Sequence, residues 1–196
     1  MSSKIEIISA AFNLLGKGPI NDIGSNSPTA NQMASNLYDV YYPKALSQSP
    51  WRFAIKLQTL NLLTQEPIID RWSSIFQLPI DYLVAWRTHP SVDYEIYGDK
   101  LYTNQDSIIL EYNALIVESS LPDYFVTYMI EKMAEILAMP ITQKSQLVQI
   151  WGEVASASLG KAMFLDSQAR TANVIIDDPI YSSKFSGSSE SRILRD

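Results

Sequence analysis

Few residues of this sequence have the types and spacing that catalysis or metal binding requires. The single histidine, His89, is followed by Pro90 and has neither cysteine nor clustered carboxylates beside it, which makes a poor ligand set for a metal. A Ser-His-Asp site would have to use His89, yet no Gly-x-Ser-x-Gly nucleophile turn accompanies it. The segment 16–18 superficially resembles a phosphate loop, but it follows a predicted helix and precedes Pro19, so we interpret it as a helix terminator. We therefore expect no catalytic residue, no metal and no cofactor.

Three carboxylates in the middle of the chain leave one enzymatic alternative open. Glycoside hydrolysis uses a matched acid and base, and Glu95, Asp99 and Asp106 could in principle supply them. Nothing in their spacing marks such a pair, and solvated turn residues explain them better. The 4 Trp and 11 Tyr residues indicate core and interface packing, because both types are enriched in protein interfaces. A carboxylate-dependent glycan hydrolase remains the alternative to a protein without enzymatic activity.

The composition predicts a globular protein that is not built to grip nucleic acid. Of the 196 residues, 46% are hydrophobic and 18% are charged, as in ordinary folded domains. The net charge of −6 disfavours nucleic-acid binding, which needs clustered Lys and Arg. No apolar run approaches the roughly 20 residues that cross a bilayer, and Glu6 interrupts any signal-peptide core. With no cysteine in the chain, we expect a cytoplasm-like compartment and no membrane partner.

Apolar residues at helical spacing predict helices at both ends of the chain. A short helix over 3–15 should end at Gly16, and a second over 28–48 should start with Ser27 as its N-cap and kink at Pro43. The segment 121–170 reads as a hairpin of two long helices, with an apolar stripe that includes Ile150 and Met163. We expect the first of them to stop before Pro140, with Thr142 capping the second.

The middle third alternates in the manner of strands. Strands are expected over 53–63, 75–78, 82–87, 94–97, 100–103 and 107–113, with a tight hairpin at Gly98-Asp99. The predicted fold class is therefore α+β but mainly α. A helical bundle of residues 1–50 and 120–170 would carry an inserted small antiparallel β-subdomain, or open barrel, of residues 51–119. An extended C-terminal arm, 171–196, would follow and become ordered on a partner.

A series of short motifs, taken in order, resembles one known family. The resemblance covers about residues 8–170. Four of the motifs are the segments 11–20, 28–30, 37–39 and 137–142. The others are Ser49-Pro50-Trp51-Arg52-Phe53-Ala54, Leu78-Pro79-x-Asp81, Tyr112 and Leu121-Pro122-Asp123-Tyr124-Phe125. This order and spacing resembles the tail tubular protein A family, the head-to-tail adaptors of short-tailed phages. The C-terminus departs from the family, since Glu190 follows Ser188-Ser189 where family members often carry a Trp.

The resemblance implies a structural virion protein of the podovirus type. Family members form a ring of twelve beneath the portal protein, with the nozzle, tail tubular protein B, below, and DNA passes through the channel during ejection without specific binding. A net acidic channel wall would repel phosphate over about 10 Å. The alternative then becomes a tail-associated glycan hydrolase. The protein would be assembled in the host cytoplasm and located in the tail connector of the virion.

Two sets of residues follow as candidate sites. The resemblance implies that the C-terminal segment reaches the portal, so its apolar and basic residues are candidate portal contacts: Phe185, Arg192, Ile193, Leu194 and Arg195. The polar faces of the predicted hairpin are candidates for subunit contacts or channel lining: Glu131, Lys132, Glu135, Gln146, Gln149 and Glu153.

Overall fold

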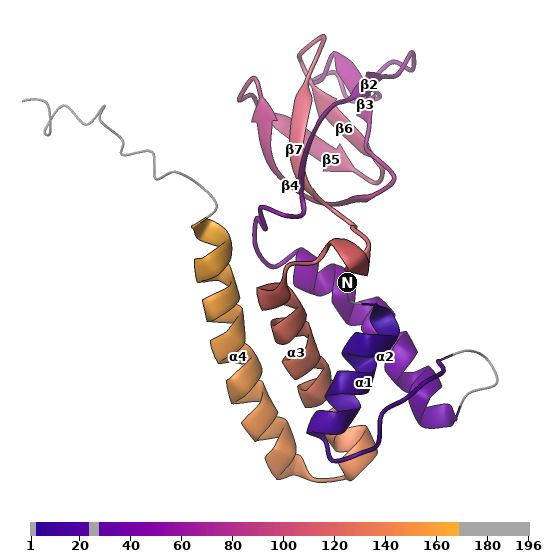
Figure 1. The fold of residues 1–196 in the computed structure, drawn as a ribbon. Helices are drawn as coiled ribbons and strands as arrows, with labels where there is room; N and C mark the ends of the chain where they lie inside the picture. The colour runs from indigo at the N-terminus through magenta and orange to yellow at the C-terminus, as the bar shows by residue number, and fades with distance from the viewer. Residues whose placement is uncertain (1–2, 24–27, 169–196) are drawn as a thin grey trace, which may run out of the picture.

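Four α-helices and two antiparallel sheets make up the part of the chain that the computed structural model describes, residues 3–23 and 28–168 (Figure 1). The helices are α1 (Lys4–Leu14), α2 (Thr29–Leu46), α3 (Asp123–Thr142) and α4 (Ser145–Ser167), with a 3-10 turn at Glu118–Ser120. The strands are β1 (Ile55–Thr59), β2 (Asn61–Leu62), β3 (Ser74–Gln77), β4 (Tyr82–His89), β5 (Tyr94–Tyr97), β6 (Lys100–Thr103) and β7 (Ile109–Ala114).

The prediction of a mainly helical protein is wrong. About 46% of the described residues are helical and 20% lie in strands, so the fold is a mixed α+β structure with two antiparallel sheets. The sheets are too large to be an appendage of the helices, because they bury a hydrophobic core of their own. That core includes Leu60, Phe76, Leu101, Leu110 and Tyr112, and it is separate from the core between the helices.

The two sheets replace the small sheet or open barrel expected from the sequence. One has the strand order β1-β7-β4 and the other β2-β3-β6-β5. The strand expected over 53–63 divides at Leu60, because β1 pairs with β7 whereas β2 pairs with β3 in the other sheet. The hairpin at Gly98-Asp99 is confirmed: Tyr97 pairs with Lys100, and Gly98 has a φ of 62°. Glycine reaches that left-handed region without steric cost.

Helix α3 lies at the centre of the helical part (Figure 1). It packs against α1, α2 and α4, whereas α4 packs mainly along α3 and lies on the side away from α1 and α2. The start of α1 is fixed by a capping box, in which the Ser3 hydroxyl accepts from the Glu6 N–H and the Glu6 carboxylate accepts from the Ser3 N–H. None of the described helices combines the length and apolar character needed to cross a bilayer.

Both prolines inside the predicted helices are tolerated. Helix α2 continues through Pro43 to Leu46, as the sequence led us to expect. The expectation that Pro140 would end α3 at Met139 is wrong, since the helix continues to Thr142. Pro140 is exposed and stands in the last turn, so its missing N–H removes one hydrogen bond at a helix end that frays in any case.

The end of α3 is fixed by Gln143 instead of the proline. Gln143 has a φ of 56° and donates its N–H to the Met139 carbonyl at 3.0 Å, which is a left-handed C-cap. Thr142 does not cap the next helix, because its hydroxyl donates to the Ala138 carbonyl at 2.6 Å and Lys144 occupies the N-cap position of α4. At the start of α2, Pro28 is the N-cap and the helix begins at Thr29. The expected Ser27 cap lies outside the described residues.

Candidate functional site

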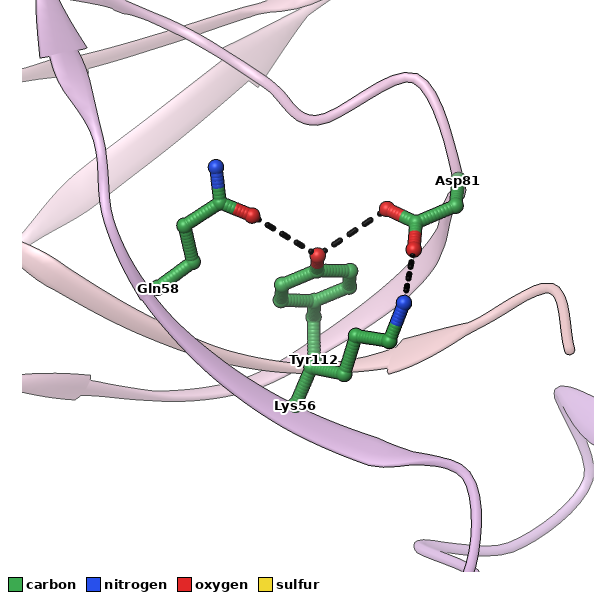
Figure 2. A network of polar contacts seen from close by, with 4 residues as sticks. All are labelled: Lys56, Gln58, Asp81 and Tyr112. Carbon is green, nitrogen blue, oxygen red and sulfur yellow. Dashed lines mark hydrogen bonds and ion pairs between the residues drawn. The ribbon is translucent and has the colours of Figure 1, made fainter.

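A polar network links the neighbouring strands β1 and β7 to the loop that precedes β4 (Figure 2). The Lys56 ammonium of β1 pairs with the Asp81 carboxylate at 2.5 Å. The Tyr112 hydroxyl of β7 lies 3.0 Å from the other Asp81 oxygen and 3.1 Å from the Gln58 side-chain oxygen. Because a phenol has a single proton to donate, the two acceptors share it.

The protonation states of this network suit a structural role. Burial acts to raise the pKa of Asp81, but hydrogen bonds from Lys56 and Tyr112 and the Lys56 charge outweigh it, so the pKa lies below its usual range. Burial, together with the hydrogen bond to Asp81, raises the pKa of Tyr112 to about 12. Tyr112 therefore stays protonated at neutral pH and acts as a donor that holds the loop at Asp81 against β1 and β7, not as a base.

Two of the carboxylates considered for glycan hydrolysis, Glu95 and Asp99, are held in hydrogen bonds that favour their ionised form. Hydrogen bonds from Tyr97 (2.6 Å) and Trp72 (3.0 Å), with the Arg71 charge, hold the pKa of Glu95 below its usual range. A hydrogen bond from Gln77 does the same for the pKa of Asp99. A glycosidase needs a general acid with a raised pKa, and neither residue provides it.

Glu95, Asp99 and Asp106 instead occupy exposed or half-exposed positions around the β2-β3-β6-β5 sheet, where Glu95 ties the loop at Arg71 to β5. His89 is exposed at the end of β4, and its Nε2 lies 3.4 Å from a Glu111 oxygen. Within residues 3–23 and 28–168, no cluster of three or more His, Asp or Glu side chains is arranged to hold a metal ion.

Buried polar side chains connect the helices to the sheets. Asn113 of β7 is fully buried and donates from its amide to the carbonyls of Leu46 and Ser49, at 2.6 Å each. Asp166, near the end of α4, is 5% exposed and accepts from the Arg52 N–H and from the Tyr124 hydroxyl, at 2.8 Å each. Burial and the hydrogen bond to Asp166 raise the pKa of Tyr124. These contacts fix the end of α4 beside the segment that leads into β1.

Neither Asp166 nor Asn113 is among the candidate residues expected from the sequence. Asp166 continues a helical stripe with Ala155 and Ala162, the two buried apolar residues of α4, at spacings of seven and four. The sequence does not show that this stripe is the buried one. Once the structure shows it, the carboxylate stands out, because a buried carboxylate must find hydrogen-bond donors. Asn113 is likewise a polar residue among buried ones, since its neighbours in β7, Tyr112 and Ala114, are buried too.

The outer face of α4 carries exposed apolar side chains. Ile150, Ala157 and Phe164 are spaced by seven residues and therefore follow one stripe along the helix. Ile150 is 53% exposed and Phe164 is 62% exposed, and Met163 beside them is exposed as well. The expectation that Ile150 and Met163 would be buried in the hairpin is wrong, because the buried stripe of α4 consists of small residues that let it approach α3 closely. We call Ile150, Ala157, Met163 and Phe164 the α4 outer face.

The six hairpin residues chosen from the sequence separate into two groups. Gln146, Gln149 and Glu153 are exposed on α4. The other three are half-buried on α3: Lys132 pairs with Glu135 at 2.8 Å, and the Glu135 side chain lies beside Gly152 of α4. One Glu131 oxygen is buried and has no hydrogen-bond partner among the described residues.

The surface of α4 is hollowed on two sides. Gln149, Gly152, Glu153, Ser156 and Ala157 line a shallow open depression. A groove of about 430 Å³ between α3 and α4 is lined by Thr127, Glu131, Lys161 and Leu165, among others. The candidate portal contacts Phe185, Arg192, Ile193, Leu194 and Arg195 lie outside the described residues.

In comparisons with known proteins, no family model and no curated protein matches this chain. The described residues form structural polar networks and an apolar helix surface, and among them no acid, base and nucleophile are assembled in one place.

Proposed function

We propose that this protein is a structural virion component, a head-to-tail adaptor that forms a homo-oligomeric ring between the portal protein and the tail nozzle. The order of motifs resembling the tail tubular protein A family suggests this role. The observation that carries it structurally is the α4 outer face, an apolar helix surface that residues 3–23 and 28–168 leave uncovered. Adjacent subunits in a ring need such a surface, since burying apolar area drives association.

The opposite side of the helical part offers a second, different surface. Val40 on α2 is 66% exposed, and α2 lies across α3 from α4 (Figure 1). A ring requires a heterologous contact in which one surface of a subunit meets another surface of its neighbour. The α4 outer face and the side of α2 that carries Val40 lie on opposite sides of α3 and are the two surfaces that the proposal uses. The proposed contact places the α4 outer face of one copy against α2 of the next.

The charge of the chain suits a channel that DNA crosses. The net charge of −6 keeps phosphate from binding to the wall, and screening limits the repulsion to about a Debye length of roughly 10 Å. Glu153, Gln146 and Gln149 are exposed polar residues of α4 that can face either a neighbour or the channel.

A single substitution in the α4 outer face tests the ring. Phe164→Glu places a charge in the proposed contact. Because the Phe164 side chain is exposed, the change should have little effect on the stability of the monomer. We expect the variant to lose the oligomer formed with the cognate portal protein, measured by native mass spectrometry, and to keep the melting temperature of the wild type. Ile68→Glu is the matched control, because Ile68 is 85% exposed on the distant loop between β2 and β3. A Phe164→Glu variant that assembles like the wild type would contradict the proposed contact.

A further inference from the structure

The edge of the β1-β7-β4 sheet at β1 is open. Within the described part of the chain, β1 pairs with β7 alone, and every residue from Lys56 to Thr59 is exposed. The ladder to β7 uses alternate residues of β1: Ala114 donates to the Ala54 carbonyl at 2.9 Å, and Leu60 donates to the Ile108 carbonyl at 3.0 Å. In an antiparallel pair the intervening residues direct their backbone groups the other way. Leu57 and Thr59 therefore present N–H and C=O groups to the open edge.

The side chains beside this edge are partly apolar. Leu57 is 63% exposed and pairs with Glu111 of β7. Ile109, two residues from Glu111 on the same face of β7, is exposed too. An exposed edge strand with an apolar neighbour is a template for a further strand, and proteins commonly cover such an edge. The described residues contain no segment that does so.

The C-terminal end of α4 lies near the N-terminal end of β1. Asp166 accepts from the Arg52 N–H at 2.8 Å, and Arg52 shortly precedes the first residue of β1, Ile55. Figure 1 shows the same relation, with the upper end of α4 beside the segment that leads from α2 into the sheets. The chain that continues beyond Ser167 therefore starts where β1 starts.

The sequence that follows contains a run suited to a strand. Val174-Ile175-Ile176 consists of β-branched residues, which favour extended structure. Asp177 and Asp178 follow, and then Pro179, which has no N–H to give to a sheet and is typical of a strand end. The chain between Ser167 and Val174 spans up to about 23 Å when extended, which exceeds the roughly 17 Å between Arg52 and Leu57 along β1.

We propose that residues 173–177 of the same chain add to the open edge of β1 as an eighth strand, parallel to β1. In an extended strand Val174 and Ile176 point to one face and Ile175 to the other, so two β-branched side chains can cover Leu57. This docking would anchor the C-terminal segment at the sheet and leave residues beyond Pro179 available to a partner. It does not depend on ring formation.

Engineered disulfides test the docking, because the chain has no cysteine of its own. Leu57→Cys is combined in turn with Val174→Cys, Ile175→Cys and Ile176→Cys, and the control combines Leu57→Cys with Ser189→Cys. Neighbouring strands bring Cα atoms within the 4.4–6.8 Å that a disulfide spans. We expect at least one of the three pairs to form an intramolecular disulfide about tenfold faster than the control. Equal rates for all four pairs would overturn the proposal, and so would cross-linked dimers, which would place the segment on a neighbouring copy.

Hydrogen exchange gives a second readout that leaves Leu57 intact. The amides of Leu57 and Thr59 should exchange about tenfold more slowly in the full chain than in the Ile175→Pro variant, since proline disrupts the added strand. Ile193→Pro makes the same change outside residues 173–177 and should leave the exchange at the wild-type rate. Rapid exchange of both amides in all three proteins would show that the edge is open to solvent and overturn the proposal.

Discussion

Removing the Asp166 carboxylate should detach the end of α4 from the rest of the protein. The side chain is 5% exposed and accepts two hydrogen bonds, from the Arg52 N–H and from the Tyr124 hydroxyl. No cation lies within ion-pair distance of it in the part of the chain that the structure describes, so these two donors carry its stabilisation. Hydrogen bonds to charged groups contribute about 1.5–3 kcal/mol each, and removing the acceptor also leaves both donors unsatisfied.

The burial cost of the carboxylate offsets part of this loss, because a variant without it no longer desolvates a charge. We therefore expect Asp166→Ala to lower the free energy of unfolding by about 3 kcal/mol, and Asp166→Asn, which keeps one acceptor, by about half of that. Tyr124→Phe should cost about 1.5 kcal/mol, since Asp166 retains the Arg52 N–H. The assay is urea unfolding followed by tryptophan fluorescence, which reports on Trp51 in the buried core.

A double-mutant cycle isolates the contact between the two side chains. Asp166→Ala combined with Tyr124→Phe should cost about 1 kcal/mol less than the sum of the single changes, because both remove the same hydrogen bond. Ser167→Ala, next in sequence and exposed, is the control and should stay within about 0.5 kcal/mol of the wild type. Strictly additive costs for the two changes would refute the reasoning.

Three further predictions follow from other parts of the fold. The pKa of Tyr112 is raised to about 12 in the folded protein, so its stabilising effect is complete below pH 10 and is lost between about pH 10 and 12. Between about pH 10 and 12 the free energy of unfolding of the wild type should fall by about 3 kcal/mol more than that of Tyr112→Phe. Plots of the free energy of unfolding against pH that run parallel for the two proteins over that range would count against this. Asn113→Ala should cost about 2–3 kcal/mol in chemical unfolding, because the Leu46 and Ser49 carbonyls lose their donor; a cost below about 0.5 kcal/mol would mean that water replaces the amide. Deleting residues 181–196 should weaken binding to the portal protein in a pull-down without shifting the melting temperature, and a drop of many degrees would place that segment in the core.

The helices were largely predictable from the sequence because their apolar spacing is a local signal. Helix α1 and the strands β5 and β6 lie where the pattern placed them. The end of α3 was not predictable from Pro140, since the cost of a proline depends on how many hydrogen bonds remain beyond it, and in the last turn that number is small. The left-handed conformation at Gln143 fixes the end instead.

The balance between helix and sheet required information that is not local. Whether the strands form one small sheet or two depends on the pairing of β1 with β7 and of β2 with β3, and the chain changes sheets at Leu60 in the middle of a continuous alternating run. The exposure of the α4 outer face was not predictable for the same reason. Ile150 and Met163 satisfy a helical stripe, but the pattern does not reveal that Ala155, Ala162 and Asp166 are the residues that face α3.

The mass of the assembly formed with the portal protein tests the central claim most directly. Native mass spectrometry or electron microscopy of the mixture should show a closed ring of many copies of the 22.1 kDa chain bound to the portal. A chain that stays monomeric in the presence of the portal and does not bind it would contradict the account.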